Sequence, residues 1–204
     1  MTDKIRYEAF TTPVGEGIFP WITKADTEHD QNGVYHVDLS VPFEEAADFI
    51  AKLERVRDEF VATLPTAKQK ALAFKPVYIE EMTRPDYPEG ASKEQKAALR
   101  AEWEGEPTGN VIFRCKMKAK VTTADGSIFE QAPVVVSADT GEKIEQPVYG
   151  GSILRVRGQV VPYTNAAAGI VGISLRMKAV QVIELVTGGG GEGFWTDFPE
   201  DEVA

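Results

Sequence analysis

Cationic side chains recur at every second position in one segment of an otherwise acidic chain, whose 204 residues carry a formal net charge of −10. The residues between them are apolar or small, and such strict alternation is typical of a β-strand with one face in the core and the other in water. Cations gathered on one strand face suit a polyanion, and nucleic acid is the first candidate. The residues are Arg114, Lys116, Lys118 and Lys120.

Two later segments, 154–160 and 171–179, repeat this separation of apolar and basic positions, and no Asp or Glu occurs between 146 and 183. We predict that the three strands share a basic groove; incidental solubilising charge is the alternative. The inward set of the last segment is expected to be Val171, Ile173, Leu175, Met177 and Ala179. The phosphate-contacting set is Arg114, Lys116, Lys118, Lys120, Arg155, Arg157, Arg176 and Lys178.

A binder of unpaired strands also needs aromatic rings on which bases stack. Tyr163, beside a proline and a small-residue loop, and Tyr149, just before two glycines, are the first candidates. Trp21 and Phe19 are second choices. The competing interpretation is that each ring belongs to the core.

Hydrophobic periodicity predicts a mainly β protein with helical elaborations. The apolar spacing favours one long helix over 43–64, and Ser92 with Gln95 forms a capping box that starts a short helix through about Trp103. Asp125-Gly126 predicts a hairpin turn. The expected strands cover 7–10, 17–22, 33–41, 110–123, 127–137, 152–162 and 169–186.

These elements suit an OB-fold, a five-stranded Greek-key barrel, with an interposed helix and a flexible acidic C-terminal tail. A β-sandwich is the alternative. The predicted domain covers 1–187, with the proline-rich 65–107 as a variable insertion, and the tail covers 188–204.

The tail opens with four glycines, which act as a hinge, and contains no Lys or Arg. Acidic and aromatic side chains together predict a segment that docks on a basic surface, in a partner or in the same molecule. Its candidate contact residues are Glu192, Phe194, Trp195, Asp197, Phe198, Glu200, Asp201 and Glu202.

Other classes of protein are disfavoured. Cys115 is the single cysteine and falls on an apolar strand face, so we expect a buried, inert thiol and no zinc site. With only two histidines, no P-loop and no dinucleotide fingerprint, we expect no enzyme, no cofactor and no catalytic metal, although the many carboxylates leave a metal-dependent nuclease as a rival. No apolar stretch is long enough for a membrane span and no signal peptide is recognisable, which favours a cytoplasmic location.

Several motifs resemble, in their order from Gly33 onward, the single-stranded-DNA-binding proteins of podophages of the T-seven type. The resemblance implies an OB-fold core that coats single-stranded DNA in replication and recombination, often as a homodimer, in the cytoplasm of the infected bacterium. It also implies an acidic tail that contacts the phage polymerase and helicase–primase and competes with DNA. The matching motifs are 33–39, 134–136, 150–152, 154–156, 161–163 and 182–185, followed by the glycine run and Trp195.

The chain departs from that pattern in two places. Asn165 stands where the family has a second aromatic, and the chain ends in Val203-Ala204 rather than in phenylalanine, leaving Trp195 or Phe198 for partner docking. A general DNA-coating protein that also binds duplex, and a protein-interaction module without DNA binding, therefore stay as alternatives.

Overall fold

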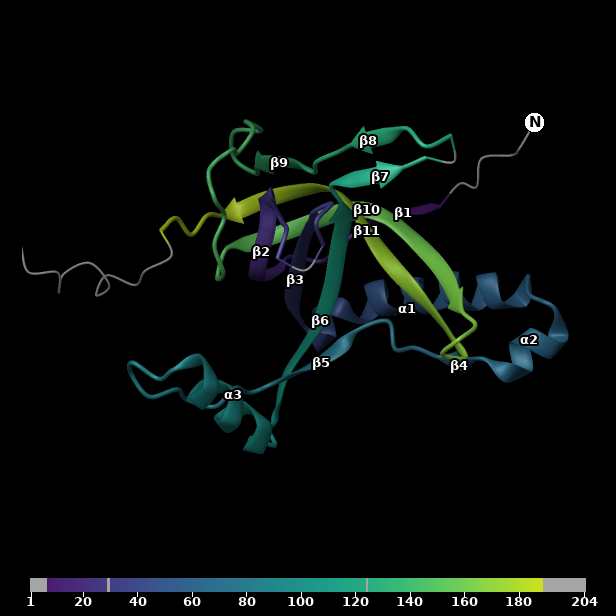
Figure 1. Ribbon diagram of the computed structural model, residues 1–204, viewed down its shortest axis with the longest axis horizontal. Coiled ribbons are helices and arrows are strands. Elements are labelled where there is room, and N and C mark those ends of the chain that lie inside the picture. The colour runs from purple at the N-terminus through teal and green to yellow at the C-terminus, as the bar shows by residue number, and fades with distance from the viewer. Residues whose placement is uncertain (1–6, 29, 124, 189–204) are drawn as a thin grey trace, which may run out of the picture.

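Five long strands close into a barrel in the computed structural model, which describes residues 7–28, 30–123 and 125–188 (Figure 1). Each strand is long because apolar residues alternate with polar ones over most of its length. The strands are β2 (Gly15–Asp26), β3 (Val34–Pro42), β6 (Pro107–Lys118), β10 (Ile153–Asn165) and β11 (Ile170–Glu184).

The pairing of these strands forms a ring in the order β2-β3-β6-β11-β10 and back to β2. The β6–β11 pair is parallel and the others are antiparallel. The β10–β2 closure is short, with Ile153 opposite Glu16 and Leu154 opposite Gly15. A closed ring of five strands whose order departs from the chain order at β6–β11 and β10–β2 matches the predicted Greek-key barrel, and the β-sandwich alternative is wrong.

The barrel core follows the predicted alternation. Val37, Leu39 and Val41 of β3 are buried, and so are Phe113 and Cys115 of β6. Burying a side chain of this size contributes about 1.5–3 kcal/mol. Burial also raises the pKa of the Cys115 thiol, with a smaller contribution from the charge of Asp38. The expected burial of this cysteine is confirmed.

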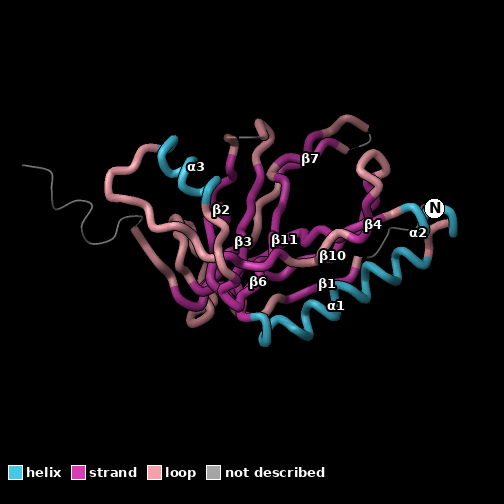
Figure 2. Tube along the Cα trace, turned by 90° about the horizontal axis from the view of Figure 1, so that it is seen from below, coloured by secondary structure: helices cyan, strands magenta, loops and turns pink. Residues whose placement is uncertain are grey.

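The long helix α1 (Phe43–Ala62) begins directly after β3 and packs across β3, β6, β10 and β11. Its buried stripe is centred on Phe49, whose ring lies 5.8 Å from that of Phe10 and 4.9 Å from that of Phe113. Figure 2 places α1 along one side of the barrel, while β7 rises from the opposite side. The helix predicted at 43–64 is therefore confirmed to within two residues.

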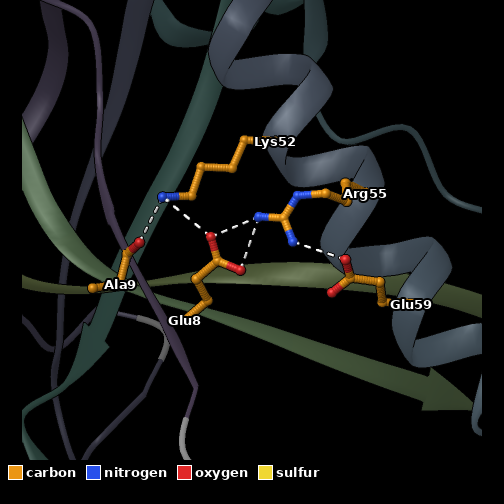
Figure 3. Close-up of polar contacts among 5 residues, drawn as sticks. All are labelled: Glu8, Ala9, Lys52, Arg55 and Glu59. Atoms are coloured by element: carbon orange, nitrogen blue, oxygen red, sulfur yellow. Dashed lines mark hydrogen bonds and ion pairs between the residues drawn. The ribbon is translucent and has the colours of Figure 1, made fainter.

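Strand β1 (Glu8–Thr11) pairs with β10 and is tied to α1 by a polar cluster (Figure 3). Glu8 accepts hydrogen bonds of 2.8 and 3.0 Å from Arg55, and Lys52 donates to the carbonyl of Ala9 at 2.7 Å. The Arg55 hydrogen bond lowers the pKa of Glu8. Exposed pairs of this kind contribute at most about 1 kcal/mol each, so the cluster fixes orientation more than stability.

The predicted insertion 65–107 contains more structure than its prolines suggested. It holds α2 (Thr66–Ala71), β4 (Ala73–Phe74), β5 (Ile79–Met82) and α3 (Lys93–Glu102). β4 pairs with β11 and β5 pairs with β6, contacts that local sequence could not reveal. The Ser92–Gln95 capping box is confirmed, and Figure 1 shows α3 projecting away from the barrel.

The strands predicted at 110–123 and 127–137 are each broken in two. β6 ends at Lys118 because Ala119 donates its N–H to the carbonyl of Gly33 and accepts a hydrogen bond from Gln131. The chain then forms a separate hairpin of β7 (Lys120–Thr122) and β8 (Ile128–Glu130) before β9 (Val134–Ser137) joins β11. The turn at Asp125-Gly126 is where it was expected.

One predicted inward position in β11 is wrong. Ala179 is half-buried, whereas Val180 and Val182 are buried, because the register slips between Arg157 and Gly158 of β10. A bulge of this kind shifts the alternation by one residue. Gly158 allows it, since a Cβ there would lie 2.0 Å from the carbonyl oxygen of Arg176.

Candidate nucleic-acid interface

A cleft of about 650 Å³ lies between the outer face of β6 and β11 and the β7–β8 hairpin. We call it the basic cleft because four of the predicted cations line it. They are Lys116, Lys118, Arg176 and Lys178.

Local alternation places these four side chains on the outside of the barrel. Cys115 and Met117 are buried between the lysines of β6, and Met177 is buried between Arg176 and Lys178. Neighbouring strands lie about 4.8 Å apart. The parallel register sets Arg176 beside Lys116, so the basic positions of two strands meet.

The cations of the basic cleft are not neutralised by neighbours. Among residues 7–28, 30–123 and 125–188, no carboxylate forms an ion pair with any of the four. Arg176 instead lies over the ring of Tyr7, 5.5 Å from its centroid. Like charges this close repel one another, and a bound anion relieves the repulsion. The cleft is thus suited to a row of phosphates, with Asp30 as the acid in its lining.

A cross-strand row extends from the basic cleft towards β2. Lys116 is opposite His36 of β3, and His36 is opposite Trp21 of β2. Trp21 is 41% exposed, and the His36 imidazole lies 3.3 Å from the carboxylate of Asp26. The register therefore sets Trp21 in the same cross-strand row as Lys116 and Arg176. A ring that stacks on the bases of a bound strand would need such a position.

The other four predicted cations lie outside the basic cleft. Arg114 forms an ion pair of 3.2 Å with Asp38 and lines a separate cavity of about 160 Å³. Lys120 belongs to the hairpin and pairs with Glu130 at 3.0 Å. The eight predicted positions therefore do not form one continuous basic face. The remaining two, Arg155 and Arg157, are exposed on β10.

Arg157 nevertheless has a position close to the basic cleft. It is opposite Ala179, the residue after Lys178, whereas Arg155 is opposite Gln181, farther along β11. Arg157 can therefore extend the cationic surface around the barrel, and Arg155 continues it.

The two favoured tyrosines do not line the basic cleft. Tyr163 is half-buried opposite Gly172, with its ring closely approached by that glycine, near the end of the β10–β11 hairpin. Tyr149 is 37% exposed and donates its N–H to the carbonyl of Val186, beside the start of β10. The structure does not bring either ring together with the four cations, and their stacking role stays a prediction.

Phe129 is the aromatic in the lining of the basic cleft that sequence reasoning missed. It is 59% exposed on β8. The sequence did contain a signal for it: Ile128 and Phe129 are adjacent apolar residues close to a predicted turn. A strand cannot bury both side chains on one face, so one of the two is expected to be exposed.

No other kind of site is evident in the part of the chain that the structure describes. No three His, Cys, Asp or Glu side chains gather there to hold a metal ion. No helix of the described ranges is long and apolar enough to cross a membrane. The tail residues proposed for partner contacts, Glu192 to Glu202, lie outside the described residues.

Comparison with known proteins gives consistent matches, although no protein-family model matches the chain. The chain is 28% identical over 202 residues to the single-stranded DNA-binding protein of Escherichia phage T7, covering 94% of this chain and 82% of that protein. It is 36% identical over 97 residues to the protein of the same name from Enterobacteria phage T3, covering 46% of this chain and 41% of that protein.

The fold points the same way. The crystal structure of gp2.5, a single-stranded DNA-binding protein encoded by bacteriophage T7, superposes with a TM-score of 0.64 and 25% identity, covering 98% of this chain and 100% of that one. The resemblance predicted from motif order is therefore confirmed: in sequence and in fold, this chain is similar to the single-stranded DNA-binding proteins of T7-type phages.

Proposed function

We propose that this chain binds single-stranded DNA, without catalysing a reaction, in phage DNA replication and recombination. The observation that carries the proposal is the basic cleft, which is lined by four cations that have no carboxylate partners among the described residues. The two curated relatives and the matching solved structure are single-stranded DNA-binding proteins by name, which supports the same function.

Binding would rest on two kinds of contact. Phosphates would lie along Lys116, Lys118, Arg176 and Lys178, where each neutralised phosphate releases counterions. Bases would then be free to meet rings beside that row, and Trp21 would be one of them; the register that aligns it with His36 and Lys116 supports this role. Stacking is independent of base identity because every base has a π-face, so we expect little sequence preference.

A general DNA-coating function, duplex included, is the second candidate. It is favoured by Arg155 and Arg157, which are exposed on β10 beyond the basic cleft and could contact phosphates of either form of DNA. A comparison of strand forms decides between the two candidates.

The experiment is a fluorescence-anisotropy titration of labelled oligo-dT and of a matched duplex over a salt series. Tight, salt-sensitive binding of oligo-dT with weaker binding of duplex is the expected result. Equal binding of both would favour the general coating protein. If neither binds, the DNA-binding proposal is wrong and a protein-interaction module takes its place. The same samples with added Mg²⁺ or Mn²⁺ should show no cleavage of either DNA.

We further propose that residues 1–187 form the DNA-binding domain, with 65–107 as its variable insertion, and that 188–204 form a glycine-hinged acidic tail. The tail would compete with DNA for the basic cleft and recruit the phage polymerase and helicase–primase, in the cytoplasm of the infected host. Homodimerisation belongs to the same proposal. The acidic composition of the tail supports its competition with DNA, whereas recruitment and homodimerisation rest on the resemblance of motifs alone.

A deletion of residues 188–204 tests the tail. A tethered acidic segment has a high effective concentration near the cleft, so its removal should raise DNA affinity, most of all at low salt. An affinity that does not change at low salt would contradict tail competition. A pull-down of the polymerase and of the helicase–primase with the intact and the shortened chain tests recruitment separately.

A further inference from the structure

The two faces of the β7–β8 hairpin differ in what they meet. The register pairs Lys120 with Glu130, Val121 with Phe129 and Thr122 with Ile128. Side chains alternate along a strand, so the Val121–Phe129 pair lies on one face and the other two pairs on the opposite face. Val121 and Phe129 line the basic cleft, whereas Ile128 does not.

The hairpin holds Phe129 over the cleft without taking its ring into a core. In the described ranges, β7 and β8 pair only with each other, and none of their residues is buried. An isolated two-stranded hairpin is marginally stable in water. The exposed ring of Phe129 therefore has apolar surface available for a ligand.

The hairpin is nevertheless anchored at its base and closed by hydrogen bonds within its turn. At its base, Gln131 donates through its backbone N–H to the carbonyl of Ala119 at 2.8 Å and through its side chain to the carbonyl of Lys118 at 2.9 Å. At its turn, the carboxylate of Asp125 accepts hydrogen bonds from Thr123 and Ser127. The bonds at the base join the hairpin to the end of β6, which carries two of the four cations, and those in the turn keep the hairpin closed.

We infer that Phe129, with Val121 beside it, is the base-stacking wall of the basic cleft and sets a preference for unpaired strands. The inference rests on the proposed function, that the cleft binds DNA. The barrel side of the cleft carries the four cations, and the hairpin side carries Val121 and Phe129 together with the polar Thr123 and Gln131. This arrangement matches a strand with phosphates on one side and unstacked bases on the other. Cations alone contact duplex and single strand alike, whereas a ring needs a base face that a duplex keeps inside its stack.

The test compares Phe129→Ala, Phe129→Leu and Phe129→Trp with Ile128→Ala. Ile128 is the adjacent residue, is 66% exposed and lies on the opposite face of the hairpin, so it is a matched control. Leu keeps an apolar side chain but removes the π-face, and Trp enlarges it. The probes are labelled oligo-dT, an abasic oligodeoxynucleotide of the same length and a matched duplex.

We expect Phe129→Ala to weaken oligo-dT binding about 5- to 150-fold, the loss equivalent to one stacked base. Phe129→Leu should weaken oligo-dT binding almost as much as Phe129→Ala does. Phe129→Trp should bind oligo-dT as tightly as the unsubstituted chain. Binding of the abasic strand and of duplex should not change, and neither should any binding by Ile128→Ala. Because these residues are exposed, urea unfolding midpoints should equal that of the unsubstituted chain.

Failure of the inference and failure of the proposed function give different results. If the unsubstituted chain binds oligo-dT and Phe129→Ala or Phe129→Leu binds it equally well, the stacking wall is wrong while DNA binding stands. Equal losses for oligo-dT and the abasic strand would also overturn stacking, since they would mean a phosphate or shape effect. If the unsubstituted chain binds no probe, DNA binding itself is wrong.

Discussion

The salt dependence of DNA binding is the most direct consequence of the basic cleft. Each phosphate neutralised on a single strand contributes about −0.7 to the slope of log K against log salt. Four cations line the cleft, so we expect a slope of about −2.8. The affinity for oligo-dT should then fall about 50-fold between 50 and 200 mM salt.

Replacing two of the four cations, Lys116→Ala with Lys178→Ala, should halve that slope. The value expected for the double variant is about −1.4, which corresponds to a fall of about 7-fold over the same range of salt. Both side chains are exposed on their strands, so the substitutions leave the core untouched. The assay is an anisotropy titration with oligo-dT at five or more salt concentrations.

A control variant separates contact from bulk charge. Lys143→Ala also removes a positive charge, but Lys143 pairs with Glu145 at 2.8 Å and lines a different cavity from the basic cleft. Its slope should equal that of the unsubstituted chain. If each removed charge lowers the slope by the same amount in the double variant and in Lys143→Ala, the cleft is refuted as the contact site. Overall charge would then explain both results.

Three further predictions concern the scaffold. Gly158→Ala should lower the free energy of unfolding by about 1–3 kcal/mol or more, measured by urea denaturation with Gln159→Ala as a control, because the added Cβ meets the backbone of Arg176. Hydrogen bonds from Thr123, then from Ser127, lower the pKa of Asp125 to about 2, below its unfolded value of about 3.9. Its contribution to hairpin stability is thus complete above about pH 4 and is lost as pH falls through about 2, which amide exchange of the hairpin can follow. Cys115 should resist alkylation at pH 8 until the chain unfolds; a thiol that reacts in the native protein would contradict its burial.

Alternation in the sequence was sufficient to place the basic positions on the outside of the barrel. Lys116 and Arg176 lie between two buried neighbours, and Lys118 and Lys178 each follow a buried methionine, because a side-chain period of two leaves a strand residue only two faces. The helix at 43–64 was predictable for the same kind of reason, since its apolar period of 3.6 residues is uninterrupted. The register between β6 and β11 could not be predicted from the sequence, because parallel pairing depends on contacts between residues distant in the chain.

The errors have the same cause. Lys120 continues the alternation of β6, yet hydrogen bonds from Ala119 to Gly33 and from Gln131 to Ala119 end the strand, and both partners are remote from the pattern itself. Phe129 lies on β8 of the hairpin that follows this break, and it lines the cleft. The prediction for Ala179 failed because a bulge shifts the alternation without any change in composition.

The distribution of charge over the barrel explains how an acidic chain can bind a polyanion. The exposed acids of α1, among them Glu44, Glu45 and Asp48, lie on the side of the barrel opposite the hairpin that borders the basic cleft (Figure 2). At physiological ionic strength, charges more than about 8 Å apart are largely screened when exposed, so DNA in the cleft interacts with its four cations and little with α1. The net charge of −10 therefore does not decide contact at the cleft, which depends on the four cations that line it.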